Sequence, residues 1–271
     1  MVQSGKIIAA EKPRFAAIQE VDQKTGRVNG ADTCAILAET TGMHATFAKA
    51  INHDGGEYGV ALLSREQPLS VRRVPLPGGE KRVLLLCEFK DCWAGVTHLD
   101  LNEKRRLESV DLIKKEVGKC GSKPVFLSGD FNSAPESEVM LNFKKFMSVL
   151  SGEKYATYHG GNSDETEMLN TKKCIDYVMV SKEHRGRYEL RGRRVIHDRI
   201  TSDHYPVVVS VRPSDGAGKE GRFKIASFNV RCPGDQGDNS YRLRKPRIAQ
   251  VIKKYGFDIF GVQEAKPEQL Q

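Results

Sequence analysis

The residues with the clearest chemical potential stand at the end of a short apolar run, where Asp130 and Asn132 follow residues 125–127. Side chains alternate along an extended chain, so we expect Asp130 and Asn132 to point to the same side. A carboxylate and an amide placed together suit a hard metal ion or a polarised water. Taken alone, the stretch is more typical of an ordinary turn between a strand and a helix. The polar residues in the rest of the chain favour a functional site instead.

Other apolar runs also begin or end in polar groups. His98 and Asp100 close the run at 92–99, and Asp176 stands one residue inside the run at 174–180. A buried Asp176 needs a partner, because an unpaired buried charge is costly. An Asp-His pair precedes the run at 207–211, and further strand ends carry Glu20, Asn229 and Glu264.

Carboxylate and amide oxygens favour Mg²⁺ or Mn²⁺ over zinc, which would want more histidine or thiolate. The chemistry that needs such a set is in-line attack of water on a phosphoester. A metal and cationic groups offset the charge on the phosphoryl oxygens, and a base aligns the water. The residue types therefore indicate metal-dependent phosphoester hydrolysis.

These side chains require a framework of strands and helices to hold them. Apolar runs predict strands at 15–20, 60–63, 69–74, 82–89, 92–99, 124–128, 174–180, 207–211, 223–230 and 258–264. Caps and periodicity predict helices at 32–41 and 102–117, after Ser240, and from Ser133, where a capping-box spacing follows a turn at Gly129. A further short helix is expected at 6–12.

The whole chain of 271 residues, with 39% hydrophobic residues, fits one large α/β domain. Its net charge of +8 favours a polyanionic partner such as nucleic acid, although a generally basic protein fits the charge equally well. The arginine-rich stretch at 185–199 is expected as a solvated hairpin, with a phosphate-contacting rim as the alternative.

The six cysteines have no paired metal spacing, and we interpret them as reduced and structural. No leader precedes Lys6, and no apolar run is long enough to cross a bilayer. The expectation is a cytoplasmic protein with no transmembrane segment, or a secreted or periplasmic one if the true N-terminus is missing.

Seven motifs together resemble those of the endonuclease/exonuclease/phosphatase superfamily, which has the deoxyribonuclease I-like fold. They are Ser-Phe-Asn-Val-Arg, Val-Gln-Glu, Gly-Glu-Tyr-Gly-Val-Ala-Leu-Leu-Ser-Arg, Thr-His-Leu-Asp, Ser-Gly-Asp-Phe-Asn, Ile-Asp-Tyr-Val-Met-Val and Ser-Asp-His-Tyr-Pro-Val. The resemblance covers nearly all of the chain outside one linker. It implies an α/β (α+β) fold, a four-layer α/β/β/α sandwich of two mostly antiparallel sheets with the active site where strand ends converge.

The resemblance also implies roles for individual residues. The catalytic set would be His98, Asp130, Asn132, Asp176 and His204, with Asp176 orienting His204 and either Asp130 or His204 as the base. The metal would be held by Asn229, Asp203 and one of two equivalent glutamates, Glu20 or Glu264. Substrate would be contacted by Arg27, Glu57 and Tyr58, and Glu57 is expected to pair with His98.

The order of the motifs departs from the family, because the Asn229 strand lies near the C-terminus. We expect residues 1–211 to form a domain lacking its first strand, 212–222 to form a flexible linker, and 223–271 to complete the sheet. The chain is then either a circular permutant or a slice of a tandem protein.

The functional expectation is a Mg²⁺-dependent phosphodiesterase, with a nuclease favoured by the charge. A phosphatase or sphingomyelinase-like phospholipase of the same fold is a second possibility. A third is a non-catalytic module whose active site is split between incomplete domains.

Overall fold

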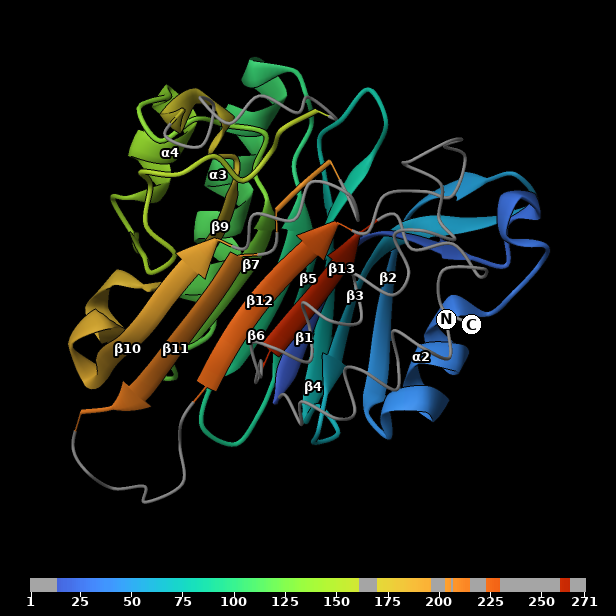
Figure 1. Cartoon of the computed structure of the whole chain (residues 1–271), viewed down its shortest axis with the longest axis horizontal. Coiled ribbons are helices and arrows are strands. Elements are labelled where there is room, and N and C mark those ends of the chain that lie inside the picture. Colours follow the sequence, from blue (N-terminus) through green and yellow to red (C-terminus); the bar gives the residue numbers. More distant parts are fainter. Residues whose placement is uncertain are drawn as a thin grey trace.

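The computed structural model describes residues 14–160, 170–195, 203–205, 207–214, 223–229 and 259–263. The helices expected at 6–12 and after Ser240, the residues Cys232 and Glu264, and parts of the arginine-rich stretch and the linker lie outside these residues. Two β layers face each other, with helices on their outer sides (Figure 1).

One layer is a six-stranded sheet in the order β4-β5-β6-β7-β9-β8. Its strands are β4 (Ser70–Leu76), β5 (Arg82–Glu88), β6 (Trp93–His98), β7 (Val125–Asp130), β8 (Met147–Val149) and β9 (Asp176–Ser181). All neighbours are antiparallel except β6 and β7, which are parallel because α3 (Glu103–Gly118) carries the chain between them. The carboxyl ends of β6 and β7 therefore lie side by side.

The facing layer contains a four-stranded sheet, β10-β11-β12-β13, and a three-stranded sheet, β1-β3-β2. Because β13 packs beside β1, the second sheet continues the first (Figure 1). The strands of this layer are β1 (Phe15–Gln23), β2 (His44–His53), β3 (Gly56–Ser64), β10 (Tyr188–Val195), β11 (Val207–Pro213), β12 (Phe223–Asn229) and β13 (Ile259–Gln263).

Apolar side chains of both layers fill the space between them, and buried residues of β1, β3, β5, β6, β9 and β11 form one cluster. A second cluster joins the outer face of the six-stranded sheet to α3 and α4 (Glu138–Phe143). On the opposite side of the molecule, α2 (Thr33–Thr41) packs on β2 and β1. The expected α/β/β/α sandwich is confirmed.

Short 3₁₀ segments complete the described elements, at Gly26–Val28, Thr171–Lys173 and Lys182–Arg187. The five described cysteines are all buried and unpaired, as expected for reduced structural residues. Among the residues that the structure describes, no helix has the length and apolar character needed to cross a membrane.

The helix expected from Ser133 was wrongly placed, because it begins at Glu138 and is capped by Ser137. The Ser137 side chain accepts a hydrogen bond from the Met140 N–H, and its own N–H donates to the Ala134 carbonyl in a preceding turn. The helix buries Val139, Met140 and Phe143 and ends there, and Met147 already begins β8. A turn closed by the Ser137 N–H and the Ala134 carbonyl precedes the helix, so the helix starts later than the capping-box spacing at Ser133 predicts.

Gly129 does not form the expected turn but lies inside β7. A Cβ at this position would come within 2.0 Å of the Thr97 carbonyl oxygen of β6. The absence of a side chain therefore lets the two parallel strands approach closely at the end that carries His98 and Asp130.

The C-terminal strands join the sheet of the N-terminal part. β12 pairs antiparallel with β11, with Val207 opposite Ser227, and β13 pairs parallel with β12, with Asn229 opposite Gln263. β11 continues to Pro213, so the strand extends past the expected boundary at residue 211. This pairing agrees with a permuted arrangement, while the division into domains and the origin of the chain stay predictions.

Candidate active site

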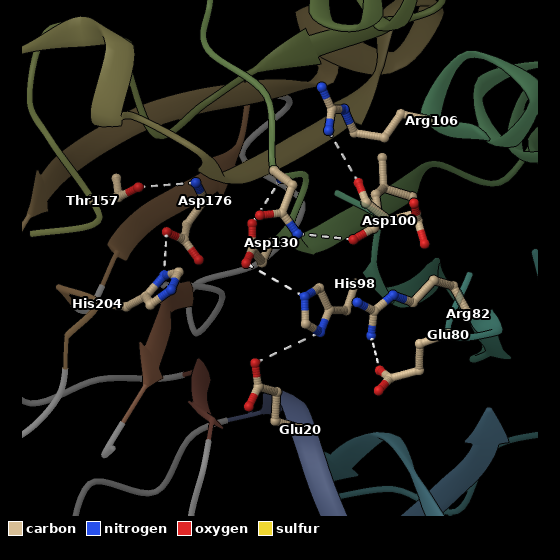
Figure 2. A network of polar contacts seen from close by, with 12 residues as sticks. Glu20, Glu80, Arg82, His98, Asp100, Arg106, Asp130, Thr157, Asp176 and His204 are labelled. Atoms are coloured by element: carbon tan, nitrogen blue, oxygen red, sulfur yellow. Dashed lines mark hydrogen bonds and ion pairs between the residues drawn. The ribbon is translucent and has the colours of Figure 1, made fainter. Parts of the chain in front are cut away.

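Three adjacent strand ends bring one histidine and two carboxylates into a row. In the ladder, His98 of β6 is opposite Asp130 of β7, and Asp130 is opposite Asp176 of β9. His98 Nε2 lies 3.6 Å from Asp130 Oδ2, and all three side chains are buried. The strand-end inference from the sequence therefore found groups that the sheet places together (Figure 2).

His204 reaches Asp176 from the opposite layer, where it precedes β11. Its Nδ1 lies 2.9 Å from Asp176 Oδ2, so the partner that Asp176 requires is His204 (Figure 2). The Thr157 hydroxyl accepts a hydrogen bond from the Asp176 N–H at 2.9 Å, and the Tyr158 ring packs 4.8 Å from the His204 ring. These contacts hold the Asp176–His204 pair in one orientation.

Glu20 enters the same region through an irregularity in β1. The pairing of β1 with β3 shifts register between Ile18 and Val21, and Glu20 adopts a left-handed φ of 55°. Its Oε1 lies 4.0 Å from Nδ1 of His98 (Figure 2). A bulge with an unusual backbone conformation is typical of a residue whose side chain is re-aimed for function.

Glu57 does not pair with His98, and that expectation was wrong. The Glu57 carboxylate accepts a hydrogen bond from Lys49 Nζ at 3.0 Å. Glu57 lies near the hairpin end of β3, opposite Asn52 of β2, and both side chains of its ion pair are 44% exposed. Glu20, delivered by the bulge, takes the place beside His98.

Asn132 lies close to Asp130, but not through strand alternation, because β7 ends at Asp130. Asn132 has a left-handed φ of 47°, and its N–H donates to Asp130 Oδ1 at 2.8 Å. Its side-chain Nδ2 donates to the Leu99 carbonyl at 2.8 Å. Asn132 therefore ties the loop after β7 to the loop after β6.

Asp100 braces the loop that follows His98. Its two carboxylate oxygens accept hydrogen bonds from the Gly79 and Asn102 N–H groups at 2.8 and 2.7 Å. These bonds lower the pKa of Asp100 although burial would raise it. The residue has a structural role in the rim of the site.

Burial and neighbouring charges separate the protonation states of the central groups. Burial, together with the charge of Asp176, raises the pKa of Asp130 to about 7. Burial lowers the pKa of His98 well below its usual value, which keeps the ring neutral. Burial alone would also lower the pKa of His204, but Asp176 raises it to about 10 by charge and hydrogen bonding.

Carboxylate oxygens in the site fit a hard cation. Asp130, Asp176 and His204 have ligand atoms within 4.8 Å of one another, although the hydrogen bond from His204 to Asp176 makes this group better suited to proton transfer. Asp176 Oδ1 and Asp203 Oδ1 are buried without a hydrogen-bond partner among the described residues. Buried oxygens of this kind are the ones that a bound cation would satisfy.

Asn229 is the last residue of β12, which pairs with β13 on one side and with β11 on the other. His204 lies shortly before the start of β11. The backbone of Asn229 therefore stands at the same edge of the layer as Asp203 and His204. The role of Asn229 as a ligand stays a prediction, and Glu264 lies outside the described residues.

Arg27 and Tyr58 lie against each other, and the charge of Glu20 acts on both side chains. Arg27 Nε lies 2.8 Å from each oxygen of the buried Asp22, and its guanidinium stands 5.2 Å from the centre of the Tyr58 ring. Burial and the charge of Glu20 raise the pKa of Tyr58. Their use in substrate binding stays a prediction.

Sequence reasoning missed three residues of the site, namely Thr157, Tyr158 and Arg82. Thr157 and Tyr158 lie in a segment without helix or strand periodicity, so no pattern marked them. Arg82 begins β5 and lies beside His98 in Figure 2, ion-paired with Glu80 at 2.5 Å. A charged residue at the first position of an apolar strand was its only signal.

Comparisons with known proteins agree with this fold. The sequence profile of the Endonuclease/Exonuclease/phosphatase family matches residues 5–204, which is most of the chain. The chain belongs to this family. A comparison with curated protein sequences gives no match.

Solved structures show the same fold. An endonuclease/exonuclease/phosphatase from Bacteroides vulgatus is 16% identical with a TM-score of 0.62, covering 79% of this chain and 90% of its own. The human Nocturnin catalytic domain is 20% identical with a TM-score of 0.55, covering 79% and 87%. The Bacteroides thetaiotaomicron mannosyl-6-phosphatase Bt3783 is 19% identical with a TM-score of 0.51, covering 66% and 80%.

Proposed function

We propose that this chain is a Mg²⁺-dependent phosphoester hydrolase that activates water for in-line attack. The observation that carries the proposal is the 2.9 Å hydrogen bond between His204 and Asp176 across the two layers, next to Asp130 and His98. Family membership supports the reaction class. The arrangement matches what phosphoester hydrolysis requires, a base, a proton donor and polar groups around one small space.

Asp130 is the proposed base. Its pKa of about 7 lets the carboxylate accept a proton from water near neutral pH while remaining a stronger base than an exposed aspartate. The Asn132 N–H fixes one carboxylate oxygen, which limits the orientations of the other. The sequence offers two candidates for the base, Asp130 and His204, and this proposal assigns the role to Asp130.

His204 is the proposed proton donor. Asp176 holds Nδ1, so the ring would contact substrate through Nε2. His98, kept neutral by burial, would stabilise a phosphoryl oxygen by hydrogen bonding.

Glu20 and Asp203, with Asn229, are the proposed Mg²⁺ ligands. When bound, the ion would offset negative charge on the phosphoryl oxygens. Asp203 Oδ1, which is buried without a hydrogen-bond partner in the described part of the chain, supports this choice. The bulge that turns Glu20 toward His98 supports it independently. Mn²⁺ would suit the same oxygen ligands.

A phosphodiester of nucleic acid is the favoured substrate, because a net charge of +8 favours a polyanion. A protein of similar fold is named a phosphatase, so a phosphomonoester is the second candidate. A phospholipid, cleaved as by a sphingomyelinase, is a third candidate substrate. If the chain hydrolyses no phosphoester, we would replace these three candidate substrates with the proposal that it is a non-catalytic module.

Hydrolysis of bis(4-nitrophenyl) phosphate and of 4-nitrophenyl phosphate, with Mg²⁺ or EDTA, tests the proposal. We expect Mg²⁺-dependent turnover that is strongly reduced in Asp203→Ala and Asn229→Ala and retained in His44→Ala, a change at an exposed position of β2. Faster hydrolysis of the monoester would favour a phosphatase. Folded protein with no turnover of either ester would refute the enzymatic proposal, and full activity of Asn229→Ala would remove Asn229 from the site.

A further inference from the structure

Arg82 is a buried cation next to the proposed active site. The residue is 9% exposed, and it lines a small cavity together with His98, Tyr58 and Ala50. Its Nε is buried and has no hydrogen-bond partner among the described residues. A charged group with an unused buried donor is costly unless something satisfies that donor. The Arg82 guanidinium therefore offers a hydrogen-bond donor to an anion bound beside His98 (Figure 2).

Glu80 neutralises Arg82, but the two side chains are held very differently. The Glu80 side chain is 46% exposed, whereas that of Arg82 is 10% exposed. The carboxylate can rotate into water while the guanidinium stays in place. A phosphate oxygen makes the same charge-assisted contact with arginine as a carboxylate does. Glu80 is thus an internal anion that a substrate phosphate can replace.

A groove leads away from this ion pair. It has a volume of about 630 Å³ and is lined by Lys49, Ala50, Ile51, Asn52, Gly79, Glu80 and Lys81. Ala50 lines both this groove and the cavity of Arg82 and His98. Lys81 is exposed in this lining, and Lys49 has a 44% exposed side chain that is ion-paired with the equally exposed Glu57.

We propose that Arg82, Lys81 and Lys49 form a subsite for a second phosphate of a single-stranded nucleic acid, and that Glu80 fills this subsite until the substrate binds. The inference rests on the proposed phosphodiesterase function and adds to it a binding site for a second phosphate of the substrate. A small phosphomonoester has no second phosphate and would not use the groove. The net charge of +8 agrees with a polyanionic substrate.

Binding measurements test the subsite independently of catalysis. The probes are fluorescein-labelled oligothymidylate and oligouridylate, followed by anisotropy in EDTA at about 50 to 200 mM NaCl. Glu80→Gln removes the internal anion and should tighten binding about two- to fivefold, the range of a half-exposed ion pair. Lys81→Ala should weaken binding and reduce the slope of log Kd against log salt by about 0.7.

Two exposed positions on α3 provide matched controls, Glu108→Gln and Lys114→Ala, and both should leave Kd and slope unchanged. Equal effects of Lys81→Ala and Lys114→Ala, or an unchanged Kd in Glu80→Gln, would refute the subsite. Binding to anionic phospholipid vesicles without binding to either oligonucleotide would overturn the choice of nucleic acid. If the oligonucleotide results hold while ester hydrolysis is absent, the proposed catalysis fails and the subsite stands.

Discussion

Replacing Asp130 with asparagine should inactivate the protein and also make its folded state more stable near pH 8. Asp130 is 5% exposed, and burial together with the charge of Asp176 raises its pKa from an ordinary 3.8 to about 7. Asparagine keeps a carbonyl oxygen to accept the Asn132 N–H, which Asp130 now accepts at 2.8 Å. The variant therefore removes the charge with little change in shape.

The magnitude follows from the pKa. Each factor of ten in proton affinity corresponds to about 1.4 kcal/mol, so ionising Asp130 costs the folded protein up to about 4 kcal/mol above pH 7. Between pH 4 and 7 the folded state binds more protons at this group than the unfolded state does, so this contribution to stability falls as pH rises. The advantage of Asp130→Asn should thus be largest above about pH 7 and disappear near about pH 4. This cost already includes the attraction of protonated His204, which lowers the pKa of Asp130.

Urea denaturation in EDTA, at about pH 5 and about pH 8, measures this difference without a bound cation. Asp111→Asn, an equivalent change at an exposed position of α3, should leave stability unchanged at both values. The turnover of Asp130→Asn should fall by about 10²- to 10⁴-fold, the usual contribution of a general base. If the variant is no more stable than the wild type near pH 8, then ionised Asp130 does not destabilise the folded state, and the prediction is refuted.

Two further predictions concern the positioning of the site. Gly129→Ala would place a Cβ 2.0 Å from the Thr97 carbonyl oxygen, so it should destabilise the fold by about 1–3 kcal/mol and reduce turnover, as measured by thermal unfolding and ester hydrolysis. The control Gly118→Ala, whose new Cβ would have no described atom within 4 Å outside its own helix and chain neighbours, should be neutral or slightly stabilising. A Gly129→Ala variant with unchanged stability would contradict the close approach of β6 and β7. Asp176→Asn and His204→Ala should each lower kcat by about 10²- to 10⁴-fold, and the double variant should be no worse than the poorer single variant, because the two side chains act as a unit. Additive losses in kcat would show that they act separately.

Local patterns in the sequence predicted much of the framework that carries the site. Apolar runs marked β6, β7, β9 and β11, and their polar ends identified His98, Asp130, Asp176 and His204. Helix caps were equally informative at α2, where the Asp32 side chain accepts from the Ala35 N–H and Gly42 is left-handed. These features depend on neighbouring residues alone, and a single sequence contains that information.

Features set by pairing between distant segments were not predictable in the same way. The bulge that turns Glu20 toward His98 depends on the register of β1 against β3, and the pairing of β3 with β2 brings Glu57 to Lys49. The proximity of Arg82 to His98 depends on which strands become neighbours in the sheet. Resemblance to a family supplied roles for residues, but the local register decided which side chains meet.

A crystal structure with Mn²⁺ and inorganic phosphate would test the account most directly, because anomalous scattering locates the ion without reference to activity. We expect Mn²⁺ on Glu20, Asp203 and Asn229, phosphate against His98 and His204, and the Asp176–His204 hydrogen bond preserved. Mn²⁺ bound instead between Asp130 and Asp176 with His204 displaced from its partner, or no bound ion near these strand ends, would contradict the proposed site.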